Sequence, residues 1–246
     1  MNLLAIDTAT EKFSIAIAAE RQGRRDTWFF EADAGMRHSE LAMDCVDMLM
    51  RKAELVPGDI GGVVCMGGPG SFTGLRIGFS MAKGLALSLG IPFAPVSTLD
   101  CLAGPLAPWP GIAVPVLDAK KRAFFCALYR EGERISPDMD ATPVEIAKAI
   151  AQNIFPKPET EGPMEHVLLF GPGAEMLCGE LGLLWESDPG NAGLKAAVKH
   201  GKGVRWGNAE TLLEMALEKG LFAEGGGATD AGPEYIRKSD AELSKH

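Results

Sequence analysis

One structural plan occurs twice in the sequence. Four short apolar runs, each bounded by polar turns, predict β-strands paired as two hairpins. These runs are 3–8 (LLAIDT) with 13–19 (FSIAIAA), and 111–118 (GIAVPVLD) with 122–129 (RAFFCALY). Laid over each other without gaps, the hairpins align Asp7 with Asp118 and Phe13 with Phe124. Each first strand therefore ends at an aspartate, followed by a short polar turn.

The second part of the plan is a strand that enters a glycine–proline turn and then a helix. It appears at 62–71 (GVVCMGGPGS) and again at 166–173 (HVLLFGPG). After the first of these, a helix and a further strand at 93–96 complete a βαβ unit, so this part of the sheet is expected to be parallel. Two such matches in the same order predict a duplicated, two-lobed α/β protein with mixed sheets.

The lobe boundary is expected in the proline- and glycine-rich segment 103–111 (AGPLAPWPG). We assign residues 1–104 to the first lobe and 105–246 to the second, with the C-terminal tail packing back on the first. The segment 155–163 is expected to be a surface loop, and 224–232 is glycine-rich.

Composition limits the functions open to such a chain. The 246 residues carry a formal net charge of −9, and a field of that sign repels RNA, whose binding depends largely on neutralising phosphates. A role in RNA chemistry must then be indirect or use a local basic patch. No apolar run approaches the ~18–20 residues that span a bilayer, and the N-terminus reads as a strand, so we expect a cytoplasmic protein with no membrane contact.

Metal and catalytic clusters are not indicated. The five cysteines are scattered, and the four histidines have no ligand spacing. No Ser/His/Asp or Cys/His set can be composed from them. A basic cluster, Lys195 to Arg205, reads as a solvated face.

Asp7, with Thr8 beside it, stands at the tip of a buried strand, where a carboxylate can hold a metal or a water. A phosphate-wrapping turn needs glycine for close backbone approach, yet the next residue is Ala9. The plainer interpretation is that Asp7 and Thr8 only end a strand.

The turn 67–71 (GGPGS) offers backbone N–H groups and a helix N-terminus to an anion. Gly68, Gly70 and Ser71 are its candidate contacts, although neither of the common nucleotide-binding fingerprints is satisfied. A tight turn with Ser71 as the helix N-cap explains the same residues.

Two helices of the first lobe are unusually apolar. The helix from Thr73 to about Leu89 has a narrow polar stripe, and its small residues recur every four positions from Gly74 to Ala86. The preceding helix also has a wide apolar face. Such helices predict a surface for a partner; the alternative is burial within this chain beneath the second lobe.

Three segments together closely resemble the TsaB family, also called YeaZ: LLAIDTAT-EKFSIAIA, MRHSELAMDCVDML, and VVCMGGPGSFTGLRIGFSMAKGLALSLGIPFAPVSTLDCLA. The turn after Asp118 and the segment 233–237 (PEYIR) are similar to that family's second hairpin and tail. The resemblance implies the actin/hexokinase/Hsp70 (ASKHA) fold, with two ribonuclease-H-like lobes. It implies a role in bacterial synthesis of N6-threonylcarbamoyladenosine (t6A) at position 37 of tRNA.

By the same resemblance, the chain is a non-catalytic scaffold that pairs with the catalytic paralogue TsaD and the ATPase TsaE, and meets tRNA only through the complex. It has no catalytic or metal-binding residue and no tightly bound cofactor, while ATP and a metal belong to the partner subunits. The family's HxxxH metal ligands are replaced by 97–102 (STLDCL). Alone, the chain can form a homodimer through the same helices. The implied partner surface comprises His38, Leu41, Cys45, Met48, Ser71, Gly74, Leu75, Gly78, Phe79, Ala82 and Leu85.

Two other functions stay open. An active small-molecule kinase or acyltransferase of the same fold would hold ATP at Asp7, Gly70 and Gly173. A metallopeptidase is the other, and the missing histidine pair argues against it.

Overall fold

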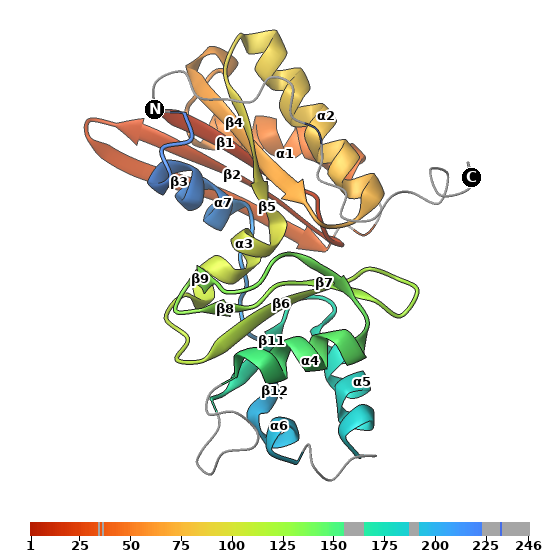
Figure 1. Cartoon of the computed structure of the whole chain (residues 1–246). Helices are drawn as coiled ribbons and strands as arrows, with labels where there is room; N and C mark the ends of the chain where they lie inside the picture. Colours follow the sequence, from red (N-terminus) through yellow and green to blue (C-terminus); the bar gives the residue numbers. More distant parts are fainter. Residues whose placement is uncertain (34, 36, 155–164, 187–191, 223–231, 233–246) are drawn as a thin grey trace. The chain divides into compact units, whose positions relative to one another are not determined.

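The computed structural model describes residues 1–33, 35, 37–154, 165–186, 192–222 and 232. It divides into two compact units (Figure 1): the first takes Met1–Cys101 and the segment from Gly207, and the second takes Leu102–Trp206. The loop expected at 155–163, most of the glycine-rich segment and the tail 233–237 lie outside the described residues.

The first unit is built on a five-stranded mixed sheet in the order β3-β2-β1-β4-β5. Strands β1, β2 and β3 are antiparallel, whereas β4 and β5 run parallel to β1. The predicted hairpin and βαβ unit are both present. The strands span Asn2–Asp7 (β1), Lys12–Arg21 (β2), Arg24–Asp33 (β3), Ile60–Gly68 (β4) and Phe93–Ser97 (β5).

Helices cover both faces of this sheet. One apolar core lies under α1 (His38–Lys52) and α2 (Phe72–Leu89), with Ile6, Ile15 and Phe79 in it. The other core lies under α7 (Ala209–Glu218), and Figure 1 shows this helix beside β1 to β3. Since β1 and β2 bury both faces, their sequences are almost continuously apolar.

The second unit contains a sheet in the order β10-β7-β6-β11-β12, in which β8 also pairs with β6 and β9 pairs with β8. Its core contains residues of three helices, α4 (Pro143–Asn153), α5 (Ala174–Glu186) and α6 (Ala192–Ala197). The strands are Ile112–Asp118 (β6), Phe124–Cys126 (β7), Tyr129–Arg130 (β8), Glu133–Arg134 (β9), Met139–Ala141 (β10), Val167–Phe170 (β11) and Val198–His200 (β12). The remaining short helices are Pro57–Asp59 (η1), Thr98–Ala103 (α3) and Gly104–Leu106 (η2).

The two hairpins share their plan but differ in register. Asp7 pairs with Ser14, whereas Asp118 pairs with Phe124, so the second turn is one residue shorter and the gapless alignment of Phe13 with Phe124 fails on the return strand. Each aspartate bends the chain in the same way, because its Oδ1 accepts a hydrogen bond from the N–H two residues on, at Ala9 (3.0 Å) and Lys120 (2.7 Å). The two hairpins are therefore similar in structure as well as in sequence.

In the described part of the chain, we find no helix of the length and apolarity needed to cross a membrane.

Candidate functional site

A groove of about 470 Å³ lies between α1 and α2. From α1 it takes Ser39 and Met43, and the rest of its lining comes from the first half of α2: Phe72, Thr73, Arg76, Ile77, Ser80 and Met81. The Arg76 guanidinium lies 3.7 Å from the centroid of the Phe72 ring, a cation–π contact that holds a cation at the apolar lining. The groove thus combines apolar contact area with a few polar groups.

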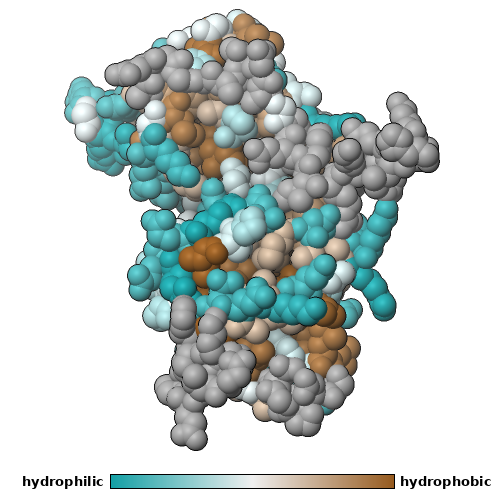
Figure 2. All heavy atoms as spheres, viewed as in Figure 1, coloured by the Kyte–Doolittle hydropathy of each residue, from teal (hydrophilic) through white to brown (hydrophobic). Residues whose placement is uncertain are grey.

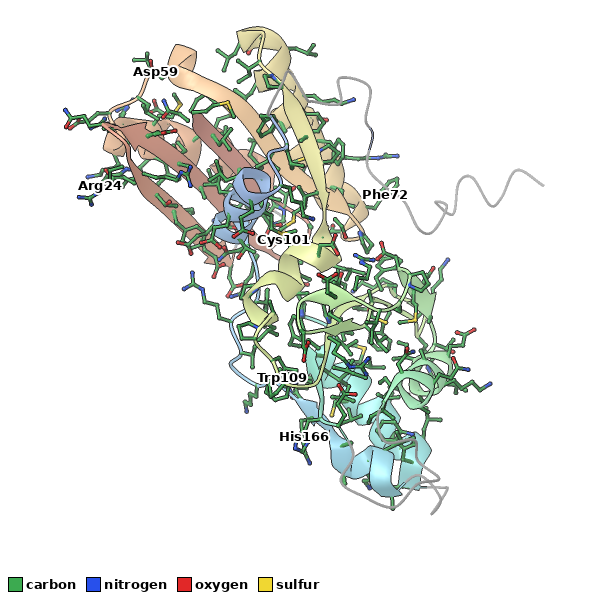
Figure 3. All side chains as sticks on the ribbon, turned by 60° about the vertical axis from the view of Figure 1, so that its left-hand side comes forward. Arg24, Asp59, Phe72, Cys101, Trp109 and His166 are labelled. Carbon is green, nitrogen blue, oxygen red and sulfur yellow. The ribbon has the colours of Figure 1, made fainter. Side chains whose placement is uncertain are left out.

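Large apolar side chains are exposed on these helices. Met43 is 50% exposed, Phe72 40% and Met48 40%; Figure 3 shows Phe72 at the N-terminal end of α2. Figure 2 shows hydrophobic residues on the visible surface of both units. Exposed Met and Phe side chains beside a groove are typical of a protein-binding surface.

The structure places several residues of the expected partner surface in the chain's own cores. Leu75, Phe79 and Ala82 are at most 4% exposed, and they pack against the sheet. They pack beneath the helix, so at most 4% of each of these residues is exposed for contact with a partner. This burial differs from the alternative stated above, which was burial beneath the second lobe, because the cover here is the first unit's own sheet.

The small-residue stripe of α2 also has an internal explanation. A Cβ on Gly74 would lie 2.0 Å from the carbonyl oxygen of Thr8, and one on Gly78 would lie 2.4 Å from Thr8 Oγ1. Thr8 Oγ1 donates to Gly74 O at 2.7 Å. The glycines therefore admit the end of β1, not a helix of another protein.

The remaining expected residues differ in burial. His38 is buried and stacks on Phe13 with ring centroids 5.9 Å apart, and Cys45 is buried, which raises the pKa of its thiol. Leu41 and Leu85 are half-buried, Met48 and Ser71 exposed. The sequence did not single out Phe72, which lines the groove and is 40% exposed, although a large apolar side chain at the start of the helix was the available signal.

Asp7 is held by the chain's own groups. Its Oδ2 accepts from Ser14 Oγ at 3.4 Å, and Ser14 Oγ accepts from Ala209 N, the first residue of α7, at 3.0 Å. Burial raises the pKa of Asp7 to about 7, although hydrogen bonds from Ala9 and Ser14 favour the charged form, and the charge of Glu31 adds to the rise. These contacts connect Asp7 to the helix on the second face of the sheet.

The polar groups of the turn 67–71 are likewise hydrogen-bonded within the chain. Ser71 N donates to Ala9 O at 2.8 Å, and Ser71 Oγ accepts from Gly74 N at 3.2 Å. A Cβ on Gly70 would lie 2.6 Å from Ala9 O. Gly70 thus allows Ala9 to approach closely, and Ser71 is the N-cap of α2, as in the interpretation of this segment as a tight turn. Gly68 is buried.

Across the ranges that the structure describes, no three His, Cys, Asp or Glu side chains are grouped to hold a metal ion. In the segment 97–102, Cys101 Sγ donates to Asn208 O at 3.4 Å, and burial raises the pKa of its thiol well above the ordinary value, with Asp7 among the charges that add to it. Figure 3 shows Cys101 beside α7. In the basic cluster 195–205, Lys195 pairs with Glu186 at 2.9 Å.

Comparisons with known proteins agree on one family. A family model described as "TsaD: tRNA N6-adenosine threonylcarbamoyltransferase" matches residues 32–176. A Bacillus subtilis protein described as tRNA threonylcarbamoyladenosine biosynthesis protein TsaB is 36% identical over 146 residues, 57% of this chain and 62% of that one. The Escherichia coli protein of the same description is 28% identical over 248 residues, 98% of this chain and 96% of that one.

A solved structure from Pseudomonas aeruginosa, described as an uncharacterized protein with similarity to peptidase YEAZ, has the same fold. Its TM-score is 0.68 at 23% identity, covering 96% of this chain and 99% of that one. With the two mixed sheets, this likeness identifies an ASKHA-type α/β fold.

Proposed function

The chain belongs to the TsaB (YeaZ) family, within the wider family that the TsaD model describes, and we propose that it is a non-catalytic subunit of the assembly that makes t6A in tRNA. In this proposal it pairs with a catalytic paralogue of the TsaD type, and an ATPase of the TsaE type joins the pair. The relatives described as TsaB biosynthesis proteins support the pathway. The groove between α1 and α2 supports the pairing.

The exposed groove is the observation that carries this proposal. Since Leu75, Phe79 and Ala82 are buried, the proposed partner surface is the lining of the groove. It consists chiefly of the exposed Met43 and Phe72 with the half-buried Ile77. Burying such side chains against a partner removes apolar area from water, which is the main favourable contribution to association. Aromatic and Met side chains are also the types enriched at interface centres.

A scaffold role accords with the state of the candidate catalytic positions. The carboxylate oxygens of Asp7 accept hydrogen bonds from Ala9 N and Ser14 Oγ, and 97–102 contains no histidine. The available donors there, Asp100 and the buried thiol of Cys101, do not fit the histidine-rich set of a transfer metal. We propose that ATP and the metal are held by the partner subunits and that this chain binds no cofactor tightly.

The test is association with the catalytic paralogue of the same organism, measured by light scattering. The double variant Met43→Asp/Phe72→Asp places charges in the groove and should weaken pairing at least about 100-fold, since desolvating each unpaired carboxylate costs several kcal/mol. The matched control is Leu87→Asp, on the same helix but outside the groove lining, where the side chain is 77% exposed. It should pair like the wild type.

Pairing that survives the groove variant, or that the control loses equally, contradicts the assigned surface. Absence of pairing by the wild type contradicts the scaffold function. A homodimer through the same groove is proposed as the resting form, so the groove variant should also lower concentration-dependent self-association.

A further inference from the structure

The turn between β6 and β7 carries three consecutive basic residues in an unusual conformation. Lys120, Lys121 and Arg122 have φ angles of 60°, 54° and 60°, in the left-handed region that non-glycine residues visit singly rather than in succession. All three are exposed. The turn is closed by two backbone hydrogen bonds, Ala119 N to Ala123 O (3.0 Å) and Ala123 N to Lys120 O (3.1 Å). The conformation is thus fixed by the turn itself.

The equivalent turn of the first unit provides a comparison within one molecule. It follows Asp7 in the same way, yet none of residues 8–13 has a positive φ, and its exposed tip carries Glu11. Many other left-handed positions among the described residues are taken by glycines, such as Gly23 and Gly90, which adopt them without strain. The non-glycine exceptions, Gln22, Glu54 and Glu131, occur singly, so a succession of three is particular to this turn. The shorter second turn explains a tight backbone, but it does not explain three cations where glycine or asparagine would fit better.

The three residues of this turn share a positive charge. Segment 118–123 (DAKKRA) carries three positive charges and one negative charge, in a chain whose net charge is −9. Asp118 fixes the first cation: Lys120 Nζ donates to Asp118 Oδ2 at 2.7 Å, in addition to the backbone bond to Oδ1. Lys121 and Arg122 are the next two residues of the turn, and both are exposed. Strained residues that persist at one exposed site point to a function that needs those side chains.

We propose that this basic turn, defined as Lys120, Lys121 and Arg122, contacts the phosphodiester backbone of an RNA. The proposal rests on the function above, in which the substrate of the assembly is an RNA, and adds a direct contact by this chain. Lysine ammonium and arginine guanidinium groups are the usual partners of RNA phosphates. A left-handed turn points successive side chains in different directions, which suits several phosphates spaced along a strand better than one enclosed nucleotide phosphate.

The experiment measures binding of a fluorescently labelled tRNA transcript to the full chain by anisotropy. The measurement is repeated at KCl concentrations from about 50 to about 300 mM, over which phosphate contacts weaken strongly. The test variant is Lys121→Gln/Arg122→Gln. The control is Arg24→Gln/Arg25→Gln, which removes the same charge from two exposed residues of β3. We expect roughly tenfold or greater weakening for the test variant at the lowest salt, and a salt dependence shallower by about 1.5 in log–log slope, since each phosphate contact contributes about 0.7–0.9. The control should match the wild type.

Equal weakening by both variants would indicate only bulk charge and overturn the proposal, as would a wild type with no salt-dependent RNA binding. A turn variant that loses ATP binding but keeps RNA binding would identify a nucleotide site instead, which also overturns it. Association with the catalytic paralogue is measured on the same variants. Retained pairing with weakened RNA binding supports the proposal. Because RNA binding and pairing are measured separately, failure of the RNA contact can be distinguished from failure of the scaffold function.

Discussion

At the scale of single residues, Asp7 makes stability depend on pH. Its pKa lies near 7 in the folded chain and at 3.8 ordinarily, so the folded state binds more protons between these values. The contribution of Asp7 to stability is therefore full below about pH 4 and is lost as the pH rises towards 7. The size of the loss is on the order of 4 kcal/mol at most, from about 1.4 kcal/mol per pKa unit.

The substitution Asp7→Asn tests this dependence. The amide oxygen can still accept from Ala9 N, but the group carries no charge to desolvate, so the variant should be more stable than the wild type at pH 8. The difference should shrink as the pH falls to 4, in urea unfolding followed by circular dichroism. Asp47→Asn, on the exposed face of α1, is the control. If the difference in unfolding free energy between Asp7→Asn and the wild type stays constant across the pH range, Asp7 is not the source of the pH dependence.

At the scale of elements, α2 shows how one helix serves two purposes. Its buried side packs on the sheet and on Thr8, while its first half lines the groove. Amphipathic pattern alone cannot separate these sides, because Phe79 in the core and Ile77 in the groove are equally apolar in sequence. The apolar excess of α2 was therefore visible in the sequence, whereas the identity of the exposed side chains was not.

Gly78→Ala should destabilise the first unit by about 1–3 kcal/mol, the usual cost of overpacking, because its Cβ would meet Thr8 Oγ1 at 2.4 Å. Gly84→Ala is the matched control on the same helix. Nothing lies within 4 Å of its Cβ position, so the variant should gain up to about 1 kcal/mol from helix propensity. Thermal unfolding of both variants checks the sign; a stabilised Gly78→Ala would refute the packing explanation of the glycine stripe.

At the scale of the whole molecule, the first unit is discontinuous in sequence. Helix α7 comes after the second unit, yet Leu212 and Leu213 belong to the first unit's core at no more than 2% exposure. A chain ending at Trp206 should therefore leave that face of the sheet uncovered. We expect it to bind a hydrophobic dye and to aggregate, whereas a chain with Leu87→Ala, an exposed position, should behave like the wild type. A monomeric, dye-negative truncation would contradict this role of α7.

The sequence predicted the local parts of this fold and fewer of the distant ones. Hairpins and the βαβ unit follow from strand periodicity and from Gly67 to Ser71, which are local signals. The register shift at Phe124 and the close approach of Gly78 to Thr8 depend on residues far apart in sequence, so no local pattern encodes them. The same holds for Asp7, whose pKa is set by burial beneath a helix that begins at Ala209.

The late arrival of α7 has a consequence for synthesis on the ribosome. Chains grow on the ribosome at about 5–20 residues per second, so roughly 5–20 s separate the emergence of Cys101 from that of α7. Throughout that interval the nascent sheet presents the apolar face lined by Leu3, Val64 and Met66 without its helix. A chaperone that binds extended apolar surface would find its longest opportunity on this chain during translation, before the last forty residues are made.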